Sequence, residues 1–509
     1  MRKQWKKNIF VRFVSIGMVS SVIILQSCQA NVPTPPITAS PTPSLTKTPI
    51  PPSPTPTLTP TSTLTPTPDQ QPTFTPDPEH THYIDGTLGS DFNEGTQSNP
   101  WQTIQKAASE MPEGDTAIVM EGNYPERVFV VRPGLTFHAQ GEVLMQGFSI
   151  QADYTTISGF TIVSLTDDIP TGIGIDVPDA GYCLIENNRF LFNTWGGLRL
   201  GNLDDPNGSH DCVVRNNVFF RNALYAAEIM GNNHLIENNN VSHTIQHHPC
   251  SSSTAPWLDA DAFRFHGSGH IFRGNIIHDM PIGHKGFDVA SCNLENLADL
   301  SKDFVSDSHT DCFQTYGDER VAGHDILFES NRCELPPASE WVEEDAGAKA
   351  FQVEGDAYNL TFRNNLVVAD LISLFLIGCH DITIAHNTFI GSGEPYSQGL
   401  QFENCIGNIQ IYNNIFYKQE AAIGHIWTEN TPVDAGYNCI YRAEGSPSRP
   451  ADPGDVWDVD LRLDSNYRLL PNSPCIDAGT DMGIMTDFDG NPRPQGAGFD
   501  IGSFEFTTP

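Results

Sequence analysis

Three short segments of the chain share one alternation of apolar and polar residues. They are residues 259–267 (DADAFRFHG), 309–317 (HTDCFQTYG) and 348–355 (AKAFQVEG). In each, a Phe is followed by a polar residue, a second buried-type position, another polar residue and a glycine. This period of two is typical of a β-strand that is buried on one face. If the three strands are neighbours in one sheet, we predict that their outward side chains form one polar surface.

A second pattern, apolar alternation that ends in asparagine, recurs along most of the chain. CLIENN, LTFRNN and IQIYNN are examples, and the aligned residues are Asn188, Asn217, Asn239, Asn275, Asn331, Asn365, Asn387 and Asn414. Their shortest intervals, roughly 22 residues, fit one coil of a solenoid. Stacked turn asparagines can hydrogen-bond the backbone of the next coil, so we interpret these residues as structural.

The segments that flank the repeats carry motifs of a known architecture. Residues 83–128 predict a strand, a polar loop, a short helix over residues 101–110 and a second strand. This stretch resembles the N-terminal cap of right-handed parallel β-helix proteins of the pectate-lyase-like superfamily. SPCIDAG and the run from DFDGNPRP to DIGSFE resemble the terminal segment of exported bacterial β-helix proteins.

The predicted fold class is therefore all-β: a single-stranded right-handed parallel β-helix with a short N-terminal capping helix. We place the β-helix at residues 81–442 and a C-terminal capping segment at residues 443–509. A solenoid needs such caps because its ends would otherwise expose unpaired strands and core.

The N-terminal residues predict export. Five basic residues precede an apolar stretch that ends in LQSC, which resembles a bacterial lipoprotein signal over residues 1–28 with Cys28 as the lipidated residue. An ordinary secretory signal is the alternative. Residues 29–80 are rich in Pro and Thr and predict an extended, disordered stalk. We expect a cell-surface protein attached to the membrane through lipid, or a secreted one.

The charge of the chain limits the classes of molecule that it can bind. The formal net charge is −35, which disfavours nucleic acid and repels anionic polymers at long range unless a local basic cleft intervenes. We expect a monomer whose partner is a polysaccharide.

Extra residues between successive asparagines accumulate on three consecutive coils, mostly just before the three opening strands. Loops gathered on one side of a solenoid commonly build its binding face. Here they are expected to wall a groove and to supply three candidate substrate-binding residues, Trp257, Lys285 and His309.

Aligning the equivalent strands predicts columns of outward side chains. The middle column reads Gly174, Arg199, Glu228, Arg264, Gln314, Gln352, Phe375 and Gln401. The next column reads Asp176, Gly201, Met230, His266, Tyr316, Glu354, Ile377 and Glu403. Asp261, Asp311 and Lys349 form a third, shorter column at the start of the strands. Because adjacent coils lie about 4.8 Å apart, neighbours within a column should touch.

Hydrolysis of a glycosidic bond needs one protonated carboxyl and one carboxylate. Asp261 and Asp311 are the natural pair, Glu228 and Glu354 are alternates, and Lys349 is close enough to tune them. HTDCF also resembles the NTDGF strand start of the polygalacturonase family, which implies a catalytic role for Asp311. We name Arg264, His266, Gln314, Tyr316 and Gln352 as substrate-binding candidates, and slightly prefer a glycoside hydrolase.

Two other functions fit the same surface. A uronate lyase would neutralise the substrate carboxylate with calcium or with Arg, Gln or His, and would abstract a proton with a base such as Lys349. Asp261, Asp311 and Glu354 would then hold Ca²⁺, whereas no other metal site is expected. A non-catalytic glycan-binding or adhesive protein is the third possibility, in which the aspartates merely cap turns.

The cysteines are consistent with export. Ten remain besides Cys28, an even number that suggests disulfide bonds. Cys183 with Cys212 and Cys379 with Cys405 occupy equivalent positions on adjacent coils, which predicts two disulfides, with unbonded stacked thiols as the alternative. Cys250 and Cys292 are expected to link two loops.

Overall fold

A computed structural model of the chain describes residues 77–166, 171–202, 205, 208–246, 248, 250, 259–280, 294–298, 310–317, 322–337, 348–393, 397–419, 421–425, 433–441, 451–457 and 459–507. The predicted signal peptide with Cys28, and the stalk up to residue 76, lie outside these residues. So do the candidates Trp257, Lys285 and His309.

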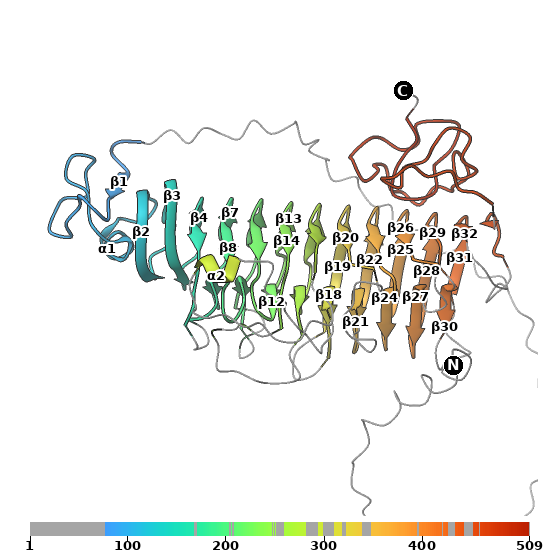
Figure 1. Cartoon of the computed structure of the whole chain (residues 1–509), viewed down its shortest axis with the longest axis horizontal. Coiled ribbons are helices and arrows are strands. Elements are labelled where there is room, and N and C mark those ends of the chain that lie inside the picture. The colour runs from blue at the N-terminus through green and yellow to red at the C-terminus, as the bar shows by residue number, and fades with distance from the viewer. Residues whose placement is uncertain are drawn as a thin grey trace, which may run out of the picture. The chain divides into compact units, whose positions relative to one another are not determined.

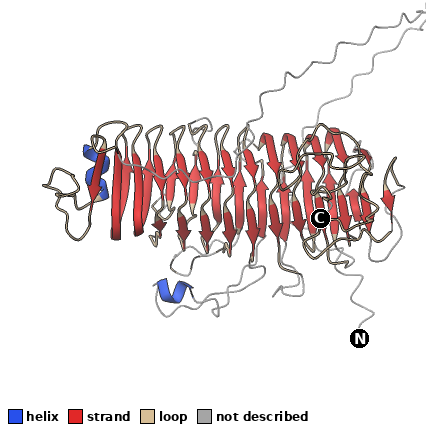
Figure 2. Ribbon diagram, turned by 90° about the horizontal axis from the view of Figure 1, so that it is seen from above, coloured by secondary structure: helices blue, strands red, loops and turns tan. Residues whose placement is uncertain are grey.

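The described strands form a parallel β-helix of three ladders (Figures 1 and 2). The chain enters it through β1 (Thr81–Ile84), β2 (Thr116–Val130) and β3 (Thr136–Ile150), and β3 pairs with the first strand of every ladder. Each coil then contributes one strand to each ladder, and every pairing is parallel.

The first ladder contains the three strands of the shared motif. It consists of β6 (Ile175–Val177), β9 (Leu198–Leu200), β12 (Tyr225–Ile229), β15 (Asp261–Phe265), β18 (Thr310–Thr315), β21 (Ala348–Val353), β24 (Ile372–Ile377), β27 (Gln398–Glu403) and β30 (Ala421–His425). The motif strands are the consecutive members β15, β18 and β21, as predicted.

The second ladder consists of β4 (Thr156–Ser158), β7 (Leu184–Glu186), β10 (Val213–Arg215), β13 (Leu235–Glu237), β16 (Ile271–Arg273), β19 (His324–Glu329), β22 (Tyr358–Arg363), β25 (His380–Ala385), β28 (Ile406–Tyr412) and β31 (Val433–Gly436). The third consists of β5 (Thr161–Ile162), β8 (Arg189–Leu191), β11 (Val218–Phe220), β14 (Asn240–Ser242), β17 (Ile276–His278), β20 (Arg332–Glu334), β23 (Leu366–Val368), β26 (Thr388–Ile390), β29 (Ile415–Tyr417), β32 (Cys439–Tyr441) and β33 (Val456–Trp457).

Helix is scarce in the part of the chain that the structure describes, being confined to α1 (Ile104–Glu110) and α2 (Leu294–Ala298). The start of α1 is fixed by the Thr103 side chain, which accepts a hydrogen bond from the backbone N–H of Lys106. Ile104 and Ala107 of α1 belong to the main core. Neither described helix is long and apolar enough to cross a bilayer.

Stacked aromatic rings fill the coil interior. The ring of Phe313 lies between those of Phe263 and Phe351, with centroid distances of 5.4 and 4.7 Å. All three are at most 1% exposed, which confirms their predicted inward orientation. Ring pairs of this kind contribute about 0.5–1.5 kcal/mol beyond their buried area. The aromatic stack holds the three motif strands in register.

The asparagine repeat forms the predicted ladder at the turn between the second and third ladders. The Oδ1 atom of Asn217 accepts hydrogen bonds from the backbone N–H and the Nδ2 of Asn188, at 2.9 and 3.2 Å. The same pair of bonds repeats through Asn239, Asn275, Asn331, Asn365, Asn387 and Asn414. It continues to Asn438, which bonds in turn to Asp455. The asparagines therefore have a structural role.

The two predicted disulfides between adjacent coils are wrong. Cys183, Cys212, Cys379 and Cys405 are buried thiols that form no disulfide bond. The first pair instead behaves like the asparagines, since the Cys212 sulfur accepts a hydrogen bond from the Cys183 backbone N–H at 3.4 Å. The alternative of unbonded stacked thiols is confirmed.

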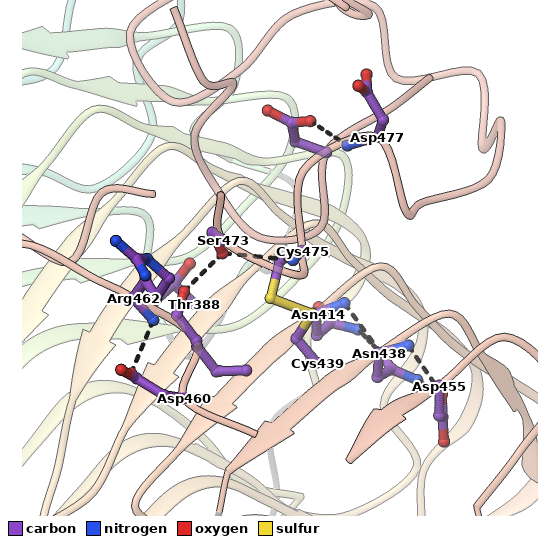
Figure 3. Close-up of a disulfide and its surroundings, with 12 residues drawn as sticks. Thr388, Asn414, Asn438, Cys439, Asp455, Asp460, Arg462, Ser473, Cys475 and Asp477 are labelled. Carbon is purple, nitrogen blue, oxygen red and sulfur yellow. Dashed lines mark hydrogen bonds between the residues drawn. A yellow bond between two sulfur atoms is a disulfide. The ribbon is translucent and has the colours of Figure 1, made fainter. Parts of the chain in front are cut away.

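Disulfides form elsewhere. Cys312 on β18 is bonded to Cys333 on β20 of the same coil, with the two Cα atoms 6.2 Å apart. Cys439 on β32 is bonded to Cys475 of the C-terminal segment, as Figure 3 shows. Cys250 is disulfide-bonded, and its predicted partner Cys292 lies outside the described residues.

The C-terminal residues from 459 onward pack along the side of the coil. Phe504 shares a small core with Leu366 and Ile390 of the third ladder. Arg493 is buried, pairs with Glu505 at 2.7 Å and also donates to the side chain of Asn364. The described contacts of this segment are thus with the side of the coil, and its closure of the coil end stays a prediction.

Candidate functional site

The outward positions of the first ladder form the predicted middle column. Arg264 pairs with Glu228 on one side and with Gln314 on the other, and Gln314 pairs with Gln352. The column continues through β24 and β27 in the predicted register. The three motif strands therefore present their polar side chains together.

The register differs from the prediction at the first strand of the ladder. Asp176, and not Gly174, is opposite Arg199, and its Oδ1 accepts a hydrogen bond from Arg199 Nε at 2.8 Å. The predicted pairing of Asp176 with Gly201 is therefore wrong. A shift of two residues leaves the same face of a strand outward, so the alternation does not distinguish the two registers.

Asp261 is fully buried and bonds to its own strand. Its Oδ2 accepts hydrogen bonds from Nε and Nη2 of Arg264, at 3.0 and 2.8 Å. Its Oδ1 has no hydrogen-bond partner within the described residues. The guanidinium carbon of Arg264 lies 5.5 Å from the ring centroid of Tyr225 and 5.9 Å from that of Tyr316, so these rings restrict its position.

Asp311 lies at the equivalent position of the next strand, where it pairs with Lys349 as predicted. Its Oδ1 accepts a hydrogen bond from the backbone N–H of Lys349 at 2.9 Å. A purely structural aspartate would also accept such a hydrogen bond from the backbone. Its Oδ2, however, is buried and finds no partner in the described part of the chain.

A third carboxylate, Asp259, belongs to the same site and was not among the predicted site residues. Its Oδ2 accepts a hydrogen bond from Gln314 Nε2 at 3.2 Å. Asp259 is also close enough to both Asp261 and Asp311 for its charge to raise their pKa values. The motif DADAF places it two residues before Asp261, the one sequence signal that pointed to it.

The last motif strand contributes a chain of polar contacts. Lys349 Nζ donates to Gln352 Oε1, and Gln352 Nε2 donates to Glu354 Oε1. Burial raises the pKa of Glu354, while the nearby Lys349 opposes this shift. Glu354 and Lys349 are thus linked through one amide, which fixes both side chains beside Asp311.

Three further candidates lie where the columns predict. The rings of His266 and Tyr316 meet edge to face with centroids 5.1 Å apart, which confirms their predicted contact. Glu228 lies in register between Arg199 and Arg264, and its charge acts on both cations. We interpret Glu228 as a counter-ion of these arginines more than as an acid.

Burial governs the protonation of the aspartate pair. It raises the pKa of Asp311 to about 7, although Lys349 lowers it, and raises that of Asp261 well above the usual range, although Arg264 opposes this. For Arg264, burial alone would lower the pKa, but the charge of Asp261 raises it above its usual value. The raised pKa of Asp261 favours a neutral carboxyl group, whereas the raised pKa of Arg264 favours a charged ion pair. Two N–H donors on one carboxylate oxygen favour the charged pair, so we place the retained proton on Asp311.

The site offers no evident metal cage. Within the described residues, no three His, Cys, Asp or Glu side chains are grouped in a way that could hold a metal ion. The calcium site expected for a lyase, made of Asp261, Asp311 and Glu354, stays a prediction.

Comparison with known sequences finds similarity over a small part of the chain. No family model matches the chain. The uncharacterized protein YwoF of Bacillus subtilis (strain 168) is 32% identical over 124 residues, which are 20% of this chain and 26% of that protein. The chain thus matches about a quarter of the length of this curated relative.

Among solved structures, a complex of XylC with xylose aligns with a TM-score of 0.45 and 13% sequence identity. The alignment covers 84% of this chain and 98% of the XylC chain. Pectate lyase Pel9A aligns with a TM-score of 0.41 and 14% sequence identity, and the alignment covers 84% of this chain and 96% of the Pel9A chain. The strand pairings of the chain itself define the class of fold: it is a right-handed parallel β-helix.

Proposed function

We propose that the protein is a carbohydrate-active enzyme that hydrolyses glycosidic bonds of a polysaccharide, with Asp261 and Asp311 as its carboxyl pair. One observation carries the proposal. Two buried aspartates lie at equivalent positions of adjacent strands, burial raises the pKa of both, and each keeps one oxygen without a partner among the described residues. Perturbed carboxyl pairs of this kind are typical of acid–base sites.

The proposal gives a role to each group. Asp311 carries the proton on its unpartnered Oδ2 and donates it to the glycosidic oxygen as the bond between that oxygen and the anomeric carbon breaks. Asp261, held as a carboxylate by Arg264, removes a proton from the attacking water through Oδ1. The water oxygen bonds to the anomeric carbon, so that one water is consumed for each bond cleaved.

Elimination is the alternative reaction, and it places a different demand on the site. A lyase must neutralise a uronate carboxylate with a cation or hydrogen-bond donors. Arg264 is already engaged by Asp261, and Lys349 by Gln352. This arrangement supports hydrolysis over elimination.

The proposal is tested with a panel of polysaccharides assayed for reducing ends and for the absorbance of an unsaturated product. Hydrolysis predicts reducing ends without that absorbance. Both signals together would identify a lyase. Neither signal, despite measurable glycan binding, would identify a non-catalytic glycan-binding or adhesive protein and would refute the proposal.

We further propose that the enzyme acts outside the cell, attached through Cys28 or secreted. The support is the basic and apolar character of residues 1–28 and the Pro/Thr composition of residues 29–80. Metabolic labelling with a fatty acid, compared between the unaltered chain and Cys28→Ala, tests the anchor. Equal labelling of both chains would contradict it.

A further inference from the structure

Three buried oxygens of the site lack hydrogen-bond partners among the described residues: Asp261 Oδ1, Asp311 Oδ2 and Gln314 Oε1. The residues that carry them are at most 3% exposed. A buried polar atom without a partner costs about 1–3 kcal/mol, so each such atom calls for an explanation, such as a catalytic role, an ordered water or a bound ligand. Catalysis occupies the two carboxyl oxygens, which leaves the Gln314 oxygen to be explained.

The orientation of the Gln314 amide is fixed by Asp259. A carboxylate only accepts hydrogen bonds, so the amide group that faces Asp259 at 3.2 Å must be the N–H donor. The carbonyl oxygen of Gln314 is thereby directed away from Asp259. Gln314 is adjacent to Arg264, whose guanidinium holds Asp261, so this oxygen belongs to the same site as the acid pair.

Negative charges outnumber positive charges around this oxygen. Asp311 holds a proton, so the carboxylates Asp259, Asp261 and Glu354 surround two cations, Arg264 and Lys349, and both cations already have side-chain partners. A bound sugar therefore meets an acceptor oxygen in acidic surroundings. Hydroxyl and ammonium groups satisfy such an acceptor, whereas a carboxylate would bring repulsion without a donor to bind it.

We propose that Asp259 is a positioning residue, which fixes the Gln314 amide so that its oxygen binds a hydroxyl or ammonium group of the substrate and excludes a uronate. The substrate class is then a neutral or amino-sugar polysaccharide. This inference rests on the proposed function for the location of the site. It concerns recognition, however, and is separable from cleavage.

The test measures binding of the full-length protein to polysaccharides in three groups: neutral xylan, galactan and glucan; chitosan as the amino-sugar polymer; and polygalacturonate and alginate as uronates. The variants are Asp259→Leu, which releases the Gln314 amide, and Asp259→Asn, whose side-chain oxygen can still accept from it. Gln401→Leu, in the same column but on a distant coil, is the matched control.

We expect binding to at least one neutral or amino-sugar polymer and at least tenfold weaker binding to the uronates. Asp259→Leu should reduce this preference at least fivefold, because the freed amide can turn its N–H group to a carboxylate. Asp259→Asn should largely restore the preference, and Gln401→Leu should keep it. The neutral and chitosan groups distinguish hydroxyl from ammonium recognition.

Three results would overturn the inference: preferential binding of a uronate by the unaltered chain, binding of no polymer in any group, or an unchanged preference in Asp259→Leu. Circular dichroism of each variant excludes misfolding as the cause of a loss. Selective binding without release of reducing ends would refute the proposed hydrolysis and leave this inference standing.

Discussion

At the scale of single residues, the site is defined by carboxyl groups that are buried and incompletely bonded. Asp261 has a guanidinium partner and Asp311 has a backbone amide, yet each retains an oxygen with no partner in the described chain. Such groups are costly to a fold, and proteins retain them mainly where they serve a function. This cost leads to two predictions for Asp311.

The first prediction concerns stability. The unfolded chain releases the Asp311 proton near its ordinary pKa of 3.8, and the folded chain at about 7. Between these values the folded state binds more protons, so the contribution of Asp311 to stability falls as the pH rises. We expect Asp311→Asn to raise the free energy of unfolding by about 1–3 kcal/mol at pH 8, with little change at pH 4. Urea denaturation at both values measures this, and equal effects at both would contradict it.

The second prediction concerns the pH dependence of cleavage. Asp311 must be protonated to act as the acid, and its pKa is about 7. The rate should therefore decline about tenfold for each pH unit well above this value. A pH–rate profile on the substrate identified by the panel measures it. A rate that stays constant up to pH 9 would remove Asp311 from the role of acid.

At the scale of elements, alternation and motif alignment predicted the central strands and the asparagine ladder correctly. The inward Phe residues fix the register of β15, β18 and β21 because a slip would break their stack. No comparable anchor exists for β6, where a shift of two residues keeps the same face outward. The buried thiols were mispredicted because equivalent positions on adjacent coils suit stacked thiols as well as disulfides. Asp259 was missed because its contact with Gln314 depends on side-chain geometry that alternation does not specify.

The asparagine ladder gives an element-scale prediction. In Asn331→Ala the backbone N–H and the Nδ2 of Asn275 both lose the oxygen to which they donate. Because these donors are buried, we expect the free energy of unfolding to fall by about 2–5 kcal/mol. Asn408→Ala, at an exposed position of β28, is the matched control and should change it by less than about 0.5 kcal/mol. Similar losses in both variants would argue against a structural ladder.

At the scale of the whole molecule, buried charge ties the C-terminal segment to the coil. The side chains of Arg493 and Glu505 are 0% exposed, and Arg493 also donates to Asn364 of the coil. Arg493→Met leaves the buried carboxylate of Glu505 without its cationic partner. This change should lower the free energy of unfolding by about 3–5 kcal/mol and make the C-terminal segment sensitive to protease.

Arg468→Met is the control for this change, because the side chains of Arg468 and Asp489 are 42% and 36% exposed and their pair should contribute at most about 1 kcal/mol. Limited proteolysis followed by mass spectrometry locates the cleavage. Equal protease resistance of the two variants would show that the buried pair does not hold the segment.

The most direct measurement of the central claim is the release of reducing ends from the polysaccharide identified by the panel, compared among the unaltered chain, Asp261→Asn, Asp311→Asn and Gln401→Ala. We expect each aspartate variant to lose at least 100-fold in rate, as for removal of a general acid or base. The Gln401 variant should retain the rate within about twofold, and no unsaturated product should form. Full activity in either aspartate variant would contradict the account.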